Sequence, residues 1–520
     1  MTQKLWQSIK KTALLGIAQK SLQAPLDDAE PALKQMLAEV DVDEPSQALW
    51  PIIGTVAVWQ KAGYTPQKIA VSLSTSSQTE ALPRCNPQAK KYLVMLLDGY
   101  FTEVTAEWLQ AIVDQNQRVP EEHLPDLLEL GRETPQLRPL IHDAIGQRGI
   151  WLAAKNPRWA YAAELTMDVE NVWYRGLHAE RVMMLQKLRQ SNPTQARELL
   201  AKSWAQESPK DRGIFLNVLT QHLDPEDEPF LETILDDRRK AVRHLAADLL
   251  SHLPNSHLVQ RMRQRTEPLI TLKRGFLASG QIQVTLPDQC EAAMARDGIE
   301  ESSKQVSMGQ KGWWLSQMIA AIPPQVWTEK WQKAPSELLK IASKSEAAPT
   351  LLLGWAVASR RYKDHSWLEA FAHYWLTHIE RHELLSEADL FSAFQALPPT
   401  TLEPIILDGF QLNSDPLHNY HPVLPFLQMD HYQWSENITR VVIDSIKRRI
   451  LQGQQHQQSF WQIRYQLKQF AQKIPASLHE EISTDWPKYS PHWKQWESEV
   501  GEFLALVKFR QQMLESIRHA

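Results

Sequence analysis

The 520-residue chain has little of what metal-dependent, disulfide-stapled or glycine-rich folds require. Its two cysteines, Cys85 and Cys290, lie far apart and in no CxxC frame, so the sequence indicates no zinc ribbon, redox pair or disulfide framework. Its 18 glycines are about half of what the typical ~7% usage would give. Scarce glycine disfavours an α/β enzyme fold, and no GxxxxGK[ST] or GxGxxG motif predicts a phosphate cradle.

Long apolar runs are also missing. The most apolar run, residues 351–358, is much shorter than the ~20 residues that a membrane-spanning helix needs. The first residues, MTQKLWQSIKKTALLG, lack the apolar core and cleavage site of a signal peptide. We therefore expect a cytoplasmic protein with no membrane segment. The formal net charge of -5 argues against a chain that is basic throughout, although local basic patches are compatible with it.

Motifs for catalysis and metal binding are missing or incomplete. No GxSxG elbow occurs, and neither cysteine lies in a signature that contains histidine. His378 and His382 form an HxxxH pair, but the HExxH form and a third ligand are absent; His418, His421 and His431 form a looser group. We expect no catalytic residue, no metal and no cofactor. The chain is therefore predicted to be non-enzymatic, with a hydrolase of unrecognised site as the more distant alternative.

What the chain does contain is helical periodicity. The clearest case is residues 238–253, where the apolar positions follow an i, i+1, i+4, i+5 pattern: Ala241, Val242, Leu245, Ala246, Leu249, Leu250 and Leu253. The charged residues fall mainly off this stripe. The pattern predicts an amphipathic helix.

Possible helix caps recur around this helix at a nearly constant spacing. Asn192-Pro193, Asp224-Pro225 and Asn255-Ser256 follow one another by 32 and 31 residues. An Asn or Asp oxygen can accept a backbone N–H at a helix start, where proline is tolerated. Two helices per ~31 residues are typical of helical hairpins that stack into a solenoid.

The fold class that we expect is therefore all-α: a helical-hairpin solenoid with additional N- and C-terminal helical regions. The predicted regions are 1–190, an N-terminal helical region; 191–275, the repeat centre; and 276–520, a C-terminal helical region. The segment 72–87 is predicted to be a loop, and 281–311 to be irregular, with a short strand in QIQVTLP.

One segment of the centre, FLETILDDRRKAVRHLAADLLSHLP, resembles a HEAT repeat. An aspartate and an arginine commonly bridge neighbouring units in such repeats. The resemblance implies this structural role for Asp237 and Arg243, which match those positions. In the preceding unit Asp211-Arg212 lies out of register.

A second resemblance extends over residues 12–370. Its motifs are TALLG (12–16), GQRGIWLA (146–153) followed by Asn156-Pro157, DDRRKAVRHLAADLL (236–250), RDGI (296–299), and Gly354-Trp355 followed by Asp364 and Trp367. These resemble a bacterial family known only as a domain of unknown function. Its members are often encoded beside a MoxR-type AAA+ ATPase, a von Willebrand A protein and a SWIM zinc-finger protein. The resemblance implies that the protein works in an AAA+ ATPase system. It assigns no catalytic residues.

Two basic stretches are the strongest signal for a binding surface. Residues 238–274 contain many more cations than acids, and residues 440–473 contain a second group with Trp461 and Tyr465 among them. Stacked repeats can align such residues along one edge, which attracts an acidic protein or phosphates. The candidate partner-binding residues are Arg238, Arg239, Lys240, Arg261, Arg263 and Arg265. The sequence therefore predicts a scaffold or adaptor for a protein partner, and the alternative is a nucleic-acid-binding solenoid.

Overall fold

The fold is predominantly α-helical, as predicted. The computed structural model describes residues 2–16, 30–40, 45–62, 79–163, 169–273, 280–302, 308–378, 392–429, 432–453 and 461–518. The chain forms two compact units, Met1–Ser76 and Ser77–Ala520. Their boundary falls in the segment 72–87 that was predicted to be a loop. The finer regions 1–190, 191–275 and 276–520 stay a prediction.

Unit 1 is a small helical unit with its own core. It contains α1 (Thr2–Leu15), α2 (Pro31–Ala38) and α3 (Pro45–Ala62), and α3 packs against both of the others. The buried side chains that meet between the helices are Leu5, Ile9, Leu33, Leu37, Ala48, Ile52 and Val56. On the outer side of α3, Trp50 and Val58 are exposed.

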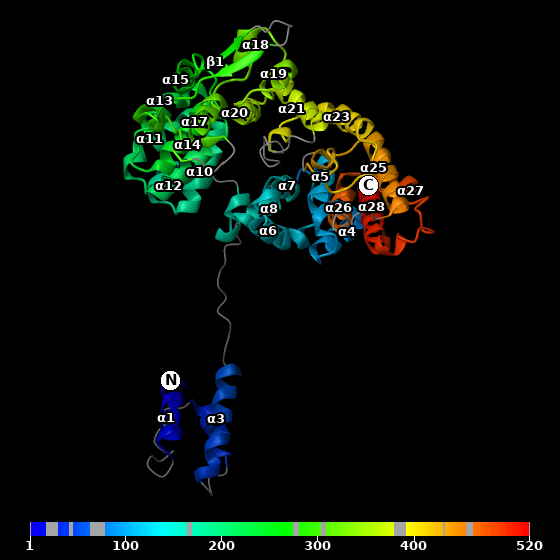
Figure 1. The fold of residues 1–520 in the computed structure, drawn as a ribbon. Helices are drawn as coiled ribbons and strands as arrows, with labels where there is room; N and C mark the ends of the chain where they lie inside the picture. Colours follow the sequence, from blue (N-terminus) through cyan, green and yellow to red (C-terminus); the bar gives the residue numbers. More distant parts are fainter. Residues whose placement is uncertain are drawn as a thin grey trace. The chain divides into compact units, whose positions relative to one another are not determined.

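Unit 2 contains the remaining helices, which follow one another along the chain and share one apolar core (Figure 1). Its first half comprises α4 (Pro87–Leu97), α5 (Thr105–Asp114), α6 (Leu124–Glu133), α7 (Arg138–Ala144), α8 (Gly146–Ala153), α9 (Val169–Arg175), α10 (His178–Ser191), α11 (Pro193–Ser203), α12 (Pro209–Leu219), α13 (Glu228–Ile234), α14 (Lys240–Ser251) and α15 (His257–Thr266). Its second half comprises α16 (Ala292–Arg296), α17 (Gly309–Ala320), α18 (Gln325–Trp331), α19 (Pro335–Ala342), α20 (Ala348–Arg361), α21 (His365–Thr377), α23 (Pro399–Leu412), α24 (Leu424–Leu427), α25 (Glu436–Gln452), α26 (Trp461–Lys473), α27 (His479–Ile482) and α28 (Glu497–Arg518). No described helix is both long and apolar enough to cross a membrane.

The helix starts in the central part follow the predicted caps. The side chain of Asn192 accepts a hydrogen bond from the backbone N–H of Gln195, and that of Asp224 accepts one from Glu226. At the third position the cap is Ser256, whose hydroxyl oxygen accepts from Val259 N–H. Each cap satisfies a backbone donor that the helix itself leaves unpaired.

The amphipathic stripe predicted over residues 238–253 forms α14. Most of the stripe is buried, and the exceptions are Ala241, which is exposed, and Leu245, which is half-buried. Ala247 lies outside the stripe but is buried too. Two faces of α14 are therefore covered, one by the neighbouring hairpin helices α12, α13 and α15, the other by the segment that follows α16.

A single hairpin interrupts the helices of unit 2 in the part of the chain that the structure describes. Strand β1 (Ile270–Lys273) pairs antiparallel with β2 (Gln281–Val284), and Ile270 lies opposite Val284. The short strand predicted in QIQVTLP is thus β2. The hairpin precedes α16 and so introduces the irregular segment that leads to the candidate site.

The last helix of unit 2 packs against the first two. α28 lies against α4 and α5 (Figure 1). Arg510 of α28 donates two hydrogen bonds of 2.6 Å to the carboxylate of Glu107 on α5, and Asn86 donates one of 2.7 Å to the carbonyl of Ser516. Arg510 is almost fully buried and also donates to the carbonyls of Ala471 and Ile474. These contacts fix the two ends of unit 2 to each other.

We expect the Arg510→Ala variant to lose about 3–5 kcal/mol of unfolding free energy, because it leaves a partly buried carboxylate and two carbonyls without their donor. Urea denaturation followed by circular dichroism measures this loss. The control is Arg440→Ala, which removes an exposed pair with Glu436 and Glu481 and should leave the urea midpoint almost unchanged. Equal effects of the two substitutions would contradict the role given to Arg510.

Candidate binding site beside helix α14

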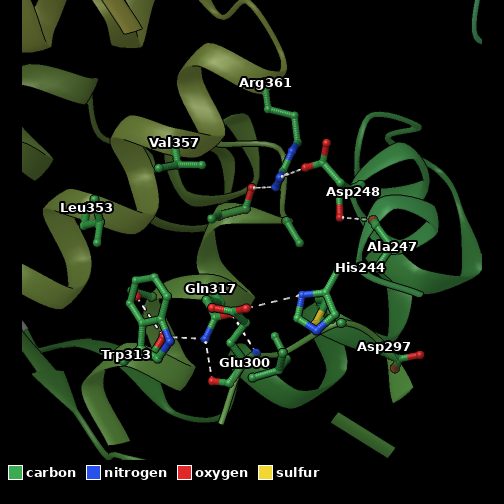
Figure 2. A pocket seen from close by; sticks show the side chains of 17 residues that line it. His244, Ala247, Asp248, Asp297, Glu300, Trp313, Gln317, Leu353, Val357 and Arg361 are labelled. Carbon is green, nitrogen blue, oxygen red and sulfur yellow. Dashed lines mark hydrogen bonds and ion pairs between the residues drawn. The ribbon is translucent and has the colours of Figure 1, made fainter. Parts of the chain in front are cut away.

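A pocket of about 360 Å³ lies beside α14 in unit 2 (Figure 2). It is enclosed by α14, by the turn that follows α16, and by α17 and α20. We call it the α14 pocket. Its lining residues lie four apart on each helix: His244 and Asp248 on α14, Trp313 and Gln317 on α17, and Leu353, Val357 and Arg361 on α20. Residues at this spacing share one helix face, so three helices each turn one face to the pocket.

The turn after α16 closes the pocket on the α14 side. Gly298 has a φ of +88°, and a Cβ at this position would lie 2.5 Å from the Cβ of Ala247. Only glycine combines this backbone conformation with so close an approach to α14. The turn at Asp297-Gly298 also brings Ile299 and Glu300 to the pocket.

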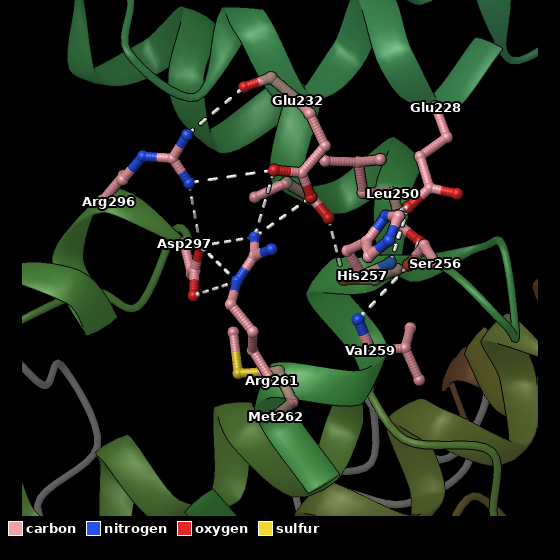
Figure 3. A network of polar contacts seen from close by, with 12 residues as sticks. Glu228, Glu232, Leu250, Ser256, His257, Val259, Arg261, Met262, Arg296 and Asp297 are labelled. Atoms are coloured by element: carbon pink, nitrogen blue, oxygen red, sulfur yellow. Dashed lines mark hydrogen bonds and ion pairs between the residues drawn. The ribbon is translucent and has the colours of Figure 1, made fainter. Parts of the chain in front are cut away.

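An ion-pair network holds this turn from behind (Figure 3). The carboxylate of Asp297 is almost fully buried, with 1% of the side chain exposed. It accepts hydrogen bonds from Arg261 at 2.7 Å and from Arg265 at 2.7 Å. Arg261 also donates to Glu232 on α13 at 3.0 Å. The network thus joins α13, α15 and the end of α16, and charges of both signs balance within it.

Glu300 lies at the rim of the pocket, and its backbone is held by Gln317. The side-chain oxygen of Gln317 accepts from the N–H of Glu300 at 2.9 Å, while its nitrogen donates to the Glu300 carbonyl at 3.2 Å. The Glu300 carboxylate lies 3.7 Å from Nδ1 of His244 and 4.0 Å from Nζ of Lys240. Burial lowers the pKa of His244, the Glu300 charge opposes this, and the cations of Lys240 and Arg243 lower the pKa further. The imidazole is therefore neutral at pH 7.

The opposite side of the pocket is held by Arg361. Its guanidinium donates to the carboxylate of Asp248 at 2.7 Å and to the carbonyl of Ala320. The next residue, Tyr362, donates its hydroxyl to the carbonyl of Ala321 at 2.7 Å. These bonds tie the C-terminal end of α20 to α17 and to α14.

The hydroxyls of the lining make hydrogen bonds within their own helices. The hydroxyls of Ser251 and Ser316 donate to carbonyls of their own helices, at 2.8 Å in both cases. Neither hydroxyl makes a hydrogen bond to His244 among the described residues, and a nucleophile needs such a base. The arrangement offers apolar walls and a few polar groups at fixed positions, which is the composition of a ligand pocket.

The six predicted partner-binding residues fall into two groups. Arg261 and Arg265 are half-buried and engaged with Asp297, and Arg263 pairs with Glu267 on the next turn of α15 at 2.9 Å. Arg238, Arg239 and Lys240 are exposed at the start of α14. Neither Arg238 nor Arg239 makes an ion pair with another described residue. We call these last three residues the basic triplet.

Of the two residues assigned a role in the repeat, Asp237 contacts the neighbouring hairpin through its side chain, whereas Arg243 donates within its own hairpin. The carboxylate of Asp237 pairs with Arg212 of α12 at 2.7 Å. Arg243 donates to the backbone carbonyl of Asp237 at 2.7 Å. Arg212, which lies out of register in the sequence comparison, is thus the residue that joins the two hairpins. Arg212 reaches the Asp237 carboxylate from the preceding hairpin. Arg243 follows Asp237 by only six residues and reaches its backbone carbonyl.

The histidines that were considered as metal ligands have structural contacts. Nε2 of His421 donates to the carbonyl of Asn413 at 3.3 Å, and Nδ1 accepts from the N–H of Val423 at 3.3 Å. Burial lowers the pKa of His421 to about 4. His382 and His431 lie outside the described residues. Within the described ranges no group of three or more His, Cys, Asp or Glu side chains could hold a metal ion.

We expect Asp297→Asn to destabilise the turn behind the pocket, because two guanidiniums lose their buried counter-charge. Breaking such a pair costs about 3–5 kcal/mol. Hydrogen exchange of the amides of residues 296–302 should become faster, and urea denaturation should give the loss of stability. The control is Asp236→Asn, whose exposed carboxylate pairs with Arg296 at the surface; unaltered exchange in Asp297→Asn would show that the network does not hold the turn.

Three of the segments that carry the family resemblance, residues 236–250, 296–299 and 354–355, belong to the elements that surround this pocket. No curated protein and no solved structure matches the chain. One family model does, over residues 8–517, and it is described as a family of unknown function, DUF5691. Since the match spans nearly the whole sequence, the chain belongs to the DUF5691 family of unknown function.

Proposed function

We propose that this protein is a non-enzymatic helical-repeat scaffold or adaptor that binds a protein partner on the α14 side of unit 2. The family has no assigned activity, so the proposal depends on the contacts of the chain itself. Two features support it: a repeated arrangement of helical hairpins, and three consecutive exposed cations, two of which form no ion pair with a described residue.

The repeat is supported by an arrangement of three side chains that occurs twice. The guanidinium of Arg181 lies over the ring of Trp173 at 4.6 Å and pairs with Glu207. Its counterpart Arg212, 31 residues later, lies over Trp204 at 5.2 Å and pairs with Asp237. Each arginine thus stacks on the tryptophan that precedes it and bridges to the acid of the next hairpin. A HEAT-like solenoid centre is the arrangement that these spacings favour.

The observation that carries the proposal is the exposure of the basic triplet. Most of the described cations in the first basic stretch have an acidic partner or a carbonyl, whereas Arg238 and Arg239 are exposed and form no ion pair with any residue that the structure describes. Three consecutive exposed cations attract an acidic surface and accelerate its encounter. They stand at the start of the same helix that lines the α14 pocket, so charge and a preformed cavity lie next to each other.

The second basic stretch gives less support to a nucleic-acid-binding solenoid. Lys447 donates to the carbonyl of Thr484, Arg449 to the carbonyl of Leu417, and the buried Lys473 to that of Met429. Arg440 and Lys468 form ion pairs with Glu481 and Glu103. Cations that are already engaged in this way do not form a free strip for phosphates. We therefore favour a protein partner.

The hydrolase alternative has one feature in its favour, the closeness of His244 to Glu300 in a pocket. What this alternative lacks, among the described residues of the pocket, is a nucleophile activated by His244. The hydroxyls that line the pocket donate to their own helices, and burial raises the pKa of Cys85 to about 11, so that its thiol stays protonated. We propose binding and no catalysis at this site.

The nature of the partner follows from the family resemblance rather than from contacts. Since members of the resembling family are often encoded beside a MoxR-type AAA+ ATPase, we propose that the partner belongs to such an ATPase system. The chain has no phosphate-binding motif, so nucleotide hydrolysis would belong to the partner.

The test is a charge reversal, Arg238→Glu/Arg239→Glu/Lys240→Glu, in the full chain. We expect the variant to remain helical and to capture at least about 10-fold less of the MoxR-type ATPase in co-purification from the native host, because attraction becomes repulsion. Mass spectrometry quantifies the captured protein.

A control with the same change in net charge is Lys202→Glu/Lys344→Glu/Lys494→Glu, at three exposed positions outside α14 and outside α12, α13 and α15, which pack against it. This variant should capture as much partner as the parent chain. Equal capture by all three proteins would refute docking at the basic triplet. A parent chain that binds DNA or RNA with a steep loss at rising salt would instead support the nucleic-acid alternative.

A further inference from the structure

We propose that the α14 pocket binds an apolar side chain from an acidic segment of the partner protein. This inference deepens the proposed function and depends on it, because it assigns the pocket to the same partner that the basic triplet attracts. Four observations carry it: the volume and walls of the pocket, the contacts that hold its walls, its unused hydrogen-bond acceptor and the charges on its rim.

The volume and walls suit an aliphatic side chain. A cavity of about 360 Å³ lies at the lower end of the range of ligand pockets, ~300–1,000 Å³, and holds a few side chains rather than a large cofactor. Its walls include Ala320, Leu353 and Val357 (Figure 2). An apolar group that enters the pocket exchanges its contacts with water for contacts with these methyl groups.

The pocket is also rigid. Arg361 ties α20 to α14, Gln317 holds the backbone of Glu300, and Asp297 is clamped by Arg261 (Figures 2 and 3). A site that needs no ordering on binding loses less conformational entropy when a partner docks. These contacts therefore hold the walls of the pocket apart.

One polar group in the lining lacks a hydrogen-bond partner and suits a peptide bond. The neutral ring of His244 makes no hydrogen bond within the described part of the chain. Glu300 lies nearest to Nδ1, which favours the proton there and leaves Nε2 as an acceptor. A backbone N–H of the partner supplies the complementary donor.

The charges select an acidic segment. Lys240 lies one helical turn before His244, and both approach the same oxygen of Glu300. The start of α14 therefore borders the pocket, and Arg238 and Arg239 directly precede it. Residues beside an anchored side chain would meet these cations, so aspartate or glutamate is the complementary neighbour.

The first test is a titration with the peptide acetyl-Glu-Asp-Leu-Asp-Glu-amide, followed by the methyl NMR signals of Ile299, Leu353 and Val357 in the full chain. We expect these signals to shift at millimolar peptide, more than the methyl signals of unit 1. Replacing the leucine of the peptide by glycine should weaken binding about 10-fold or more, because the buried side chain is lost. Acetyl-Lys-Lys-Leu-Lys-Lys-amide should not bind.

Two variants distinguish the contribution of the pocket to peptide binding from that of the charges. Val357→Trp fills the cavity and should abolish the preference for leucine over glycine; circular dichroism checks that it is folded. His244→Phe keeps an aromatic ring and removes the Nε2 acceptor, and should weaken the leucine peptide about 3-fold to 10-fold. This second variant tests the inference even where the first disturbs the fold.

The outcomes are distinguishable. Equal binding of the leucine and glycine peptides, shifts remote from the pocket, or no shift with any peptide would overturn the pocket assignment alone. The proposed function fails separately, when reversal of the basic triplet leaves capture of the partner unchanged.

Discussion

The apolar contact between successive short helices is the interaction on which unit 2 depends. Most of its helices have 7–14 residues, a length that is marginal for an isolated helix in water. Each is stabilised by burying one face against its neighbours, and the buried side chains form one cluster that runs from Cys85 to Ile517. Every polar feature of the molecule has to fit around this continuous core.

Polar groups are accommodated around this core in two ways. Inside the core several are paired: Arg189 and Asp227 are both fully buried and form a 2.7 Å ion pair, and Asp297 is held by two arginines. The start of α14 is different, because Arg238 and Arg239 are exposed and form no ion pair with a described residue. The pocket that the same helix lines gives these two surface cations a geometric context.

Sequence reasoning predicted the parts of this architecture that are local. Periodicity predicts α14, and capping residues predict the starts of α11 and α15, since each depends on neighbours within a few residues. The pocket and the networks behind it were not predicted. Arg261 looked like a free surface cation because its partner Asp297 lies 36 residues away, and Arg212 looked out of register because its acid belongs to the following hairpin. Pairing across helices is set by packing, which a single sequence does not encode in its spacing.

The join between α28 and α5 has a consequence for biosynthesis. Arg510 and Glu107 are separated by 403 positions, and Asn86 and Ser516 by 430. A nascent chain can pair consecutive hairpins as they leave the ribosome, but α4 and α5 have to wait for α28 with part of their apolar surface uncovered. Folding of unit 2 is thus completed only after translation of its final helix, and the interval before that is when chaperone assistance would matter most.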